Sequence, residues 1–141
     1  MPSVGWISGP SPQVVPAQEG TGQSYKAGDL VKFSSGQLVI ATAGAIDGIA
    51  RRDASGTANT VCEVELINFD SVYVAQYKAS ATAQTLVGSI VDFVFTVGEH
   101  TLDESAASTD AYCVALDPRD AVTTSGGRLY FKFMTASGLA S

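Results

Sequence analysis

The chain has 141 residues, of which 45% are hydrophobic and only 16% are charged, whereas a typical soluble domain has about 25% charged residues. This length allows one domain with a hydrophobic core. The formal net charge of −6, with 8 Lys and Arg against 14 Asp and Glu, argues against nucleic-acid binding, which needs clustered basic residues. No segment has the roughly 20 apolar residues that a membrane span requires, and the N-terminus does not have the pattern of a signal peptide. The low charge density predicts a surface that contacts other protein.

The first segment, Met1 to Ser24, is predicted to be an extended N-terminal arm. It is rich in proline and glycine, and because proline removes a backbone donor and glycine adds chain entropy, we expect no regular element there. The arm nevertheless carries apolar residues, and these are the candidate protein-binding anchors: Val4, Trp6, Ile7, Val14 and Val15.

The energetics of the arm favour ordering against a partner. One buried Trp contributes on the order of 4–6 kcal/mol, whereas each ordered residue costs about 1–2 kcal/mol in backbone entropy. A few anchors therefore do not hold the whole arm on its own domain. The alternative interpretation is a disordered tail with incidental hydrophobic residues.

The stretch from Tyr25 to Tyr77 contains short apolar runs separated by turns that carry glycine, a pattern typical of strands and hairpins. It predicts a turn at Ser34-Ser35-Gly36 and strands over residues 29–33, 37–41, 48–52, 61–67 and 72–77. Within Cys62–Leu66 apolar and acidic residues alternate strictly, so Glu63 and Glu65 share one face of a half-buried strand.

The C-terminal half is also predicted to be β-rich. Strands are expected over residues 90–97, 111–117 and 128–134, with Leu129, Phe131 and Phe133 pointing inward in the last one. The segment Thr101–Asp110 is polar and turn-like, and its residues 102–107 are the one place where a short helix could form. Residues 135–141 are expected to be a short tail.

Residues that could act in catalysis or bind a metal are few and scattered along the sequence. The single histidine, His100, is expected to be an exposed turn residue, because no partner motif for a general base accompanies it. Cys62 and Cys113 are expected to be reduced core thiols, with a disulfide between two strands as the alternative. Two cysteines and one histidine far apart do not make a zinc site. The acidic residues Asp103, Glu104 and Asp110 do not have the spacing of an EF-hand loop.

The sequence therefore predicts no enzyme, no cofactor and no metal. The aromatic residues fall mostly in strands, where core packing is the ordinary role. Four tyrosines could alternatively line a carbohydrate or peptide surface: Tyr25, Tyr73, Tyr77 and Tyr130.

Two short motifs in the first half resemble a known family. Lys26-Ala27-Gly28-Asp29-Leu30-Val31-Lys32 precedes the Ser-Ser-Gly turn, and Asp47-Gly48-Ile49-Ala50-Arg51-Arg52-Asp53-Ala54-Ser55-Gly56-Thr57 precedes the alternating strand. This order is similar to that of the small capsid decoration, or cement, proteins of tailed bacteriophages, over roughly Tyr25 to Ile67.

The resemblance implies a small β-barrel or β-tulip-like domain with an extended N-terminal arm. The corresponding boundaries are 1–24 for the arm, 25–134 for the barrel-like domain and 135–141 for the tail. The resemblance also implies that the protein is made in the host cytoplasm, assembles as a homotrimer, and binds the major capsid protein on the outside of an expanded phage head. Its function would be to cement neighbouring subunits, with no direct contact to nucleic acid or membrane.

The sequence is also compatible with two other functions. One is a virion adhesin, a tail or fibre module that binds a cell-surface glycan or protein. The other is a small hydrolase built on a β-barrel, for which His100 would be the residue to test.

Overall fold

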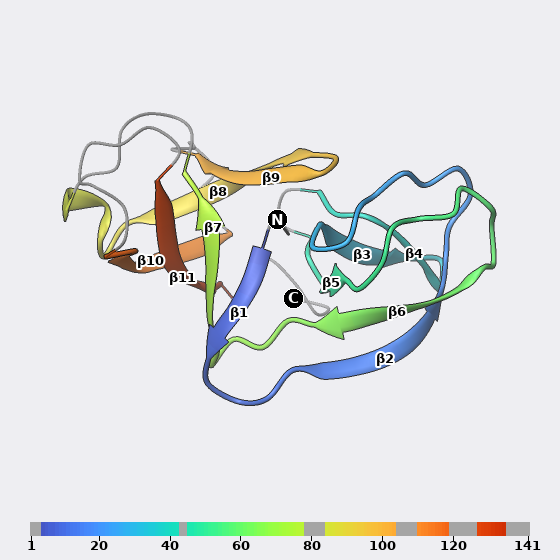
Figure 1. Ribbon diagram of the computed structural model, residues 1–141, viewed down its shortest axis with the longest axis horizontal. Helices are drawn as coiled ribbons and strands as arrows, with labels where there is room; N and C mark the ends of the chain where they lie inside the picture. The colour runs from blue at the N-terminus through green and yellow to red at the C-terminus, as the bar shows by residue number, and fades with distance from the viewer. Residues whose placement is uncertain (1–3, 43–44, 78–83, 104–109, 119–126, 135–141) are drawn as a thin grey trace.

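The computed structural model describes residues 4–42, 45–77, 84–103, 110–118 and 127–134. Within these residues the chain forms eleven strands, arranged in two antiparallel sheets, and one short 3-10 helix, Gln84–Leu86 (Figure 1). The predicted all-β fold class is confirmed.

The six-stranded sheet contains the last five strands of the chain and the first one. In spatial order its strands are β1 (Val4–Ser8), β7 (Val72–Gln76), β11 (Arg128–Phe133), β10 (Ala111–Leu116), β8 (Ile90–Thr96) and β9 (Glu99–Asp103). The five-stranded sheet lies beside it (Figure 1), and its order is β2 (Gln13–Gln18), β6 (Val61–Leu66), β5 (Gly48–Ala50), β3 (Leu30–Ser34) and β4 (Gln37–Ile40).

Both sheets curl, and in each a single parallel bridge joins distant strands. In the six-stranded sheet, Tyr77 beyond the end of β7 bridges Leu102 of β9. In the five-stranded sheet, Glu19 beyond the end of β2 bridges Leu38 of β4, and the Gly20 N–H donates to the Leu38 carbonyl at 2.9 Å. The predicted barrel-like character therefore takes the form of two small curled sheets.

The strands predicted by alternation lie within a residue or two of their expected positions. In β11, Leu129, Phe131 and Phe133 are buried as predicted. The turn between β3 and β4 has positive φ at Ser35 (50°) and Gly36 (79°), and this left-handed pair gives the two-residue hairpin turn that matches strand twist.

Two expectations about the chain are wrong. Residues before Ser24 form β1 and β2, although the proline and glycine content predicted no regular element. The polar segment after Gly98 continues as β9 through Asp103, so the option of a helix starting at Leu102 is excluded for its first residues; residues 104–109 lie outside the described part of the chain.

One hydrophobic cluster joins the two sheets. From the five-stranded side it takes Leu30, Ile46, Ile49 and Ile67, and from the six-stranded side it takes aromatic residues that include Tyr73, Phe93, Phe131 and Phe133. The rings of Phe93 and Phe131 meet edge to face with centroids 5.4 Å apart, an arrangement that aromatic pairs favour. Because residues of both sheets share this core, the sheets are packed together.

A second cluster fills the other face of the five-stranded sheet. It consists of Tyr25, Val31, Leu38, Ala50, Cys62 and Val64. Cys62 belongs to this cluster and Cys113 to the first, and both are free, buried thiols. This agrees with the expectation of reduced core thiols, and burial raises the pKa of the Cys113 thiol.

Candidate protein-binding surface

The N-terminal segment runs along both sheets as a single ribbon. Val4 of β1 lies opposite Ala75 of β7, and Val15 of β2 lies opposite Val64 of β6. Val15 follows Val4 by as many residues as Ala75 follows Val64, so these two pairs have the same register. Residues 4–18, here called the N-terminal ribbon, therefore pair with residues 61–76 in both sheets, and the register, which shifts between Trp6 and Ser8, is the same again in β2 (Figure 1).

The ribbon passes between the sheets at Gly9. This residue has φ of +107°, and a Cβ there would lie 2.8 Å from the Ser71 Cα, so a larger residue would meet backbone. The next carbonyl, that of Pro10, accepts hydrogen bonds from the Ser71 hydroxyl at 3.1 Å and from the Trp6 indole Nε1 at 3.2 Å. Hydrogen bonds from Ser71 and from Trp6 therefore hold the chain in place where it crosses between the sheets.

A proline is tolerated in β2 because of where its nitrogen points. The Glu19 N–H donates to the Thr60 carbonyl at 2.9 Å, and hydrogen-bonded pairs alternate along an antiparallel ladder. Pro16 therefore directs its donor-less nitrogen to the free edge of the sheet, the position at which a strand accepts proline.

The five predicted anchors do not behave as one group. Val4 is buried in the core that joins the sheets, and Val15 packs partly buried against the second cluster. Three residues remain on the surface: Trp6 is 38% exposed, Ile7 39% and Val14 40%. Only these three are available to contact a partner, and we call them the exposed anchors.

A groove lies beside Trp6, between the two sheets. Its volume is about 270 Å³, and it is lined by Val4, Gly5, Trp6, Ala27, Gly28, Ile49, Ala50, Arg51 and Glu65. Its polar groups include an ion pair, Arg51 Nη1 to Glu65 Oε1 at 3.3 Å. Burial raises the pKa of Glu65, and the neighbouring Arg51 opposes that rise. The groove therefore has a mixed polar and apolar lining, with one partly buried ion pair in its wall.

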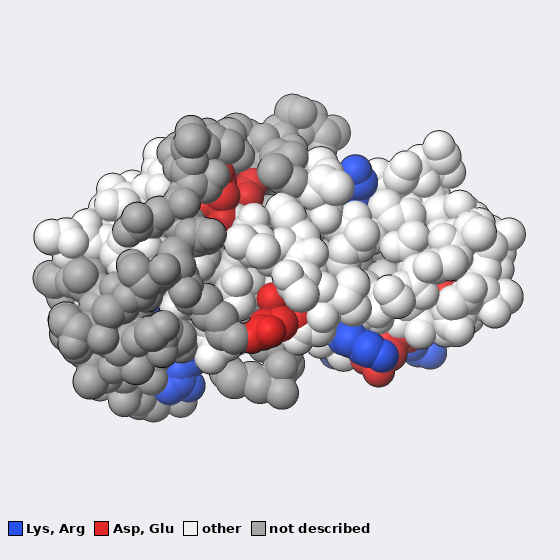
Figure 2. Space-filling view, turned by 90° about the horizontal axis from the view of Figure 1, so that it is seen from above, with Lys and Arg blue, Asp and Glu red and all other residues white. Residues whose placement is uncertain are grey.

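Charged residues make up only 16% of the chain. On the face that Figure 2 shows, which is the β9 side of Figure 1, the Lys, Arg, Asp and Glu side chains form small scattered groups. Other half-exposed apolar residues lie on strands outside the ribbon, among them Phe33 on β3 and Val94 on β8. Such a surface suits contact with protein, because the centres of protein interfaces are depleted in charge and enriched in aromatic residues.

The residues considered for chemistry are mostly buried. His100 is not an exposed turn residue: it lies in β9, is 1% exposed, and accepts a hydrogen bond from the Leu30 N–H at 3.0 Å through Nδ1. Tyr25, Tyr73 and Tyr77 are also buried, at 1%, 0% and 0% exposure, so they do not line a sugar-binding surface.

Metal binding finds no support in the described residues. They contain no group of three or more His, Cys, Asp or Glu side chains placed to hold a metal ion. Asp110 is fully buried and accepts a hydrogen bond from the Phe93 N–H at 2.9 Å, while Glu104 lies outside the described residues. None of the helices in the described part of the chain has the length and hydropathy of a membrane-spanning segment.

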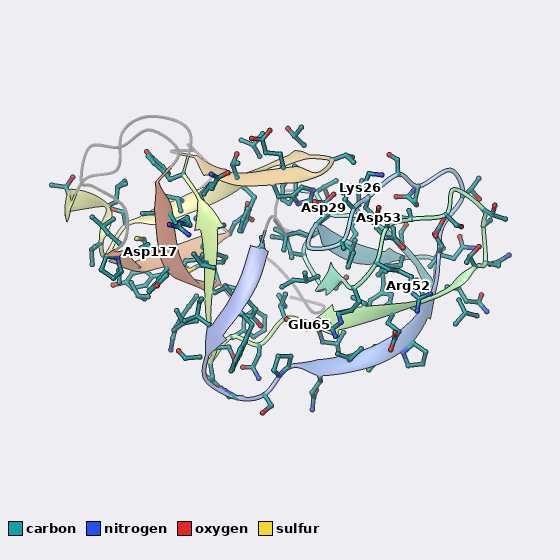
Figure 3. The ribbon with its side chains drawn as sticks, viewed as in Figure 1. Lys26, Asp29, Arg52, Asp53, Glu65 and Asp117 are labelled. Atoms are coloured by element: carbon teal, nitrogen blue, oxygen red, sulfur yellow. The ribbon has the colours of Figure 1, made fainter. Side chains whose placement is uncertain are left out.

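The motifs that carry the family resemblance hold the fold together. The Asp29 carboxylate accepts hydrogen bonds from the N–H groups of Lys26 at 2.9 Å and Gly98 at 2.8 Å. Asp53 accepts one from the Ala27 N–H at 2.9 Å and lies near the Lys26 ammonium at 3.8 Å. Figure 3 shows Lys26, Asp29 and Asp53 gathered at one end of the five-stranded sheet. These residues are structural.

Glu19 is a further structural residue, and no local sequence pattern predicts its role. It is 1% exposed, and its carboxylate accepts hydrogen bonds from the N–H groups of Ser55 at 2.8 Å and Gly56 at 2.7 Å. The only signal in the sequence is an acidic residue followed far along the chain by a Ser-Gly turn, because its partners are nonlocal. Glu19 anchors the ribbon to the loop after β5.

The Glu19→Gln variant is expected to lose about 2–3 kcal/mol of unfolding free energy, because an amide has one acceptor oxygen and places its NH₂ against backbone donors. Urea unfolding followed by circular dichroism measures this loss. Glu63→Gln is the matched control: its side chain is 54% exposed, so we expect a change within about 0.5 kcal/mol. Equal unfolding midpoints for the two variants would contradict the role of Glu19.

Comparison with known proteins shows a likeness in fold. No protein-family profile matches the sequence, and no curated protein matches it significantly. Among solved structures, the N base of head fiber gp8.5 of bacteriophage phi29 is similar, with a TM-score of 0.51 and 14% sequence identity. The similarity covers 90% of this chain and 98% of that chain. The two proteins therefore share an overall fold across nearly their whole length.

Proposed function

We propose that this protein is a structural component of a bacteriophage virion that binds the outer surface of the expanded head and cements neighbouring major capsid subunits. The observation that carries this proposal is the likeness in fold to a phage head fiber base over 90% of the chain. The motifs at Lys26–Lys32 and Asp47–Thr57, which resemble those of capsid decoration proteins, support the same function.

The surface described above suits this role. The exposed anchors lie on one ribbon that contacts both sheets, so force applied at the ribbon is transmitted to both sheets by strand pairing. A capsid presents many equivalent positions, so each copy needs only moderate affinity to stabilise the whole shell. We propose that the protein acts there as a homotrimer at local three-fold positions.

A second function is favoured by the same comparison. Because the similar structure is the base of a head fiber, this chain could instead attach a fibre or adhesin to the virion without cementing the shell. Glycan binding by such an adhesin is not favoured, because Tyr25, Tyr73 and Tyr77 are buried and do not form a sugar-binding surface.

Co-sedimentation tests the proposal. The purified protein is mixed with phage heads from which it has been stripped, in expanded and in compact precursor forms, and pelleted. We expect saturable pelleting with expanded heads only, because the binding geometry exists only after expansion. Absence of pelleting with both forms would overturn the proposal.

Heating the decorated heads separates the two functions. A cement protein is expected to raise the temperature at which expanded heads release DNA, because it adds contacts between neighbouring subunits. Saturable binding with no change in that temperature would assign the protein to fibre attachment instead.

A further inference from the structure

A cluster of buried polar contacts joins the two sheets behind the turn that borders the groove beside Trp6. The β8–β9 hairpin of the six-stranded sheet contacts the turn Lys26–Leu30, which leads into β3 of the five-stranded sheet. The Leu30 N–H donates to His100 Nδ1 at 3.0 Å, and the Gly98 N–H donates to Asp29 Oδ2 at 2.8 Å. The side chains of His100 and Asp29 are both fully buried. We call these contacts the inter-sheet latch.

The latch requires a neutral imidazole. Nδ1 accepts the Leu30 N–H, so it carries no proton, and the ring proton is on Nε2. Nε2 lies 3.8 Å from Asp29 Oδ2, and the Phe95 ring meets the imidazole edge to face with centroids 5.5 Å apart. Burial lowers the pKa of His100 below its ordinary 6.5, while the Asp29 carboxylate acts in the opposite direction.

Among the described residues, two other charged side chains neighbour the latch in sequence, those of Lys26 and Glu99, and both are exposed. Lys26, in the same turn as Asp29, extends to Asp53 and forms an exposed ion pair at 3.8 Å. Glu99 precedes His100 in β9, so its side chain is on the opposite face of the strand, where it is exposed. Asp29 is therefore the charge that faces His100 from the turn, and β8 presents the uncharged Phe95.

We propose that the inter-sheet latch is an acid-sensitive switch, in which a proton on His100 Nδ1 removes the acceptor of the Leu30 N–H and releases the β8–β9 hairpin from the Lys26–Leu30 turn. Protonation places two donors face to face in a buried site, where an unsatisfied backbone donor is costly. Attraction between the imidazolium and Asp29 does not restore the lost acceptor.

The direction of the pH dependence follows from the lowered pKa. As the pH falls below the ordinary value of 6.5, the open or unfolded chain takes up a proton before the latched form does. The contribution of the latch is fully present above that pH and is lost as the pH falls through the folded-state value.

Opening of the latch also alters the groove beside Trp6. The turn that is released supplies Ala27 and Gly28 to the groove wall, and the Gly28 carbonyl accepts a hydrogen bond from the Val4 N–H at 3.2 Å. The switch therefore couples the protonation of His100 to the shape of this groove, whichever partner the groove contacts.

Amide hydrogen exchange, followed by NMR at pH 7.5 and 5.5 and corrected for intrinsic rates, tests the switch. We expect the protection of the Leu30 and Gly98 amides to fall by several-fold at pH 5.5, up to the roughly tenfold limit that one group with an open-state pKa of 6.5 sets, while amides between β2 and β6 keep theirs. A uniform loss across all strands, or no loss at Leu30, would overturn the proposal.

The His100→Asn variant is the matched control, because its side-chain oxygen can accept near the position of Nδ1 and does not titrate. We expect its Leu30 protection to be independent of pH over this range; the same loss as in the unmodified protein would overturn the proposal. If this variant does not fold, the titration of the unmodified protein decides. The ¹⁵N shift of Leu30 must then follow the His100 ring titration, and a Leu30 shift that does not follow it rejects the switch.

Discussion

The Gly48→Ala variant is expected to lose about 2–3 kcal/mol of unfolding free energy, a loss typical of an overpacked core and a large share of the roughly 5–15 kcal/mol that stabilises a domain. Gly48 lies in β5, a central strand of the five-stranded sheet, and pairs with Val31 on one side and Leu66 on the other. A Cβ at this position would overlap the Val64 Cγ2 and lie 2.7 Å from the Glu65 carbonyl oxygen. Since neighbours on both sides hold the strand, the added methyl group has to separate β5 from β6.

The Gly5→Ala variant is the matched control for Gly48. Gly5 also lies in a strand, and a Cβ there would meet only the Val74 Cγ1, at an ordinary contact distance of 3.6 Å. We expect this variant to be neutral or stabilised by about 0.4–1 kcal/mol, because alanine restricts the unfolded chain. Urea unfolding measures both variants, and a Gly48→Ala midpoint equal to that of Gly5→Ala would contradict the predicted steric conflict.

The parts of the fold that were predictable depend on local alternation. In β6 and β11, side chains alternate between apolar and polar with a period of two, and this pattern is visible in any single stretch of sequence. It predicted both the strands and the burial of Leu129, Phe131 and Phe133. The one deviation in β6 is Glu65, which faces the groove between the sheets and is 7% exposed.

The N-terminal strands were not predictable by the same reasoning, because their pairing is nonlocal. Local composition counts Pro16 and Gly9 against regular structure. Pro16 nevertheless lies at a free sheet edge and Gly9 at the crossing between sheets, where each residue is suited to its position. The suitability of Pro16 and Gly9 becomes visible only when the pairing of residues 4–18 with residues 61–76 is known.

The buried polar residues were missed for a related reason. His100 and Leu30 are 70 residues apart in sequence, and no local pattern connects them. A lone histidine beside glycine resembles a turn residue until its backbone partner is known. The motif residue Asp29 likewise shows its structural role only through its contact with the distant Gly98.

The structure changes how the contribution of the N-terminal ribbon to binding must be tested. Deletion of residues 1–24 would remove an edge strand from each sheet and also Glu19, so loss of binding in that variant would not separate binding from folding. Substitution of exposed anchors avoids this problem, because their side chains are already about two-fifths in solvent.

The Trp6→Ala/Val14→Ser variant is expected to remain folded and to bind expanded heads about 100-fold more weakly, because a buried Trp is among the strongest contributors to protein interfaces. Phe33→Ala/Val94→Ser is the matched control: it also removes one aromatic and one valine side chain, which are 40% and 42% exposed against 38% and 40% for Trp6 and Val14.

Co-sedimentation over a range of protein concentrations gives both affinities, and urea unfolding confirms that each variant is folded. Similar losses in the two variants would mean that binding depends on general surface hydrophobicity, and unchanged binding by Trp6→Ala/Val14→Ser would remove the ribbon from the interface. A loss confined to the ribbon variant would place the contact on a segment that pairs within both sheets, as the proposed cementing function requires.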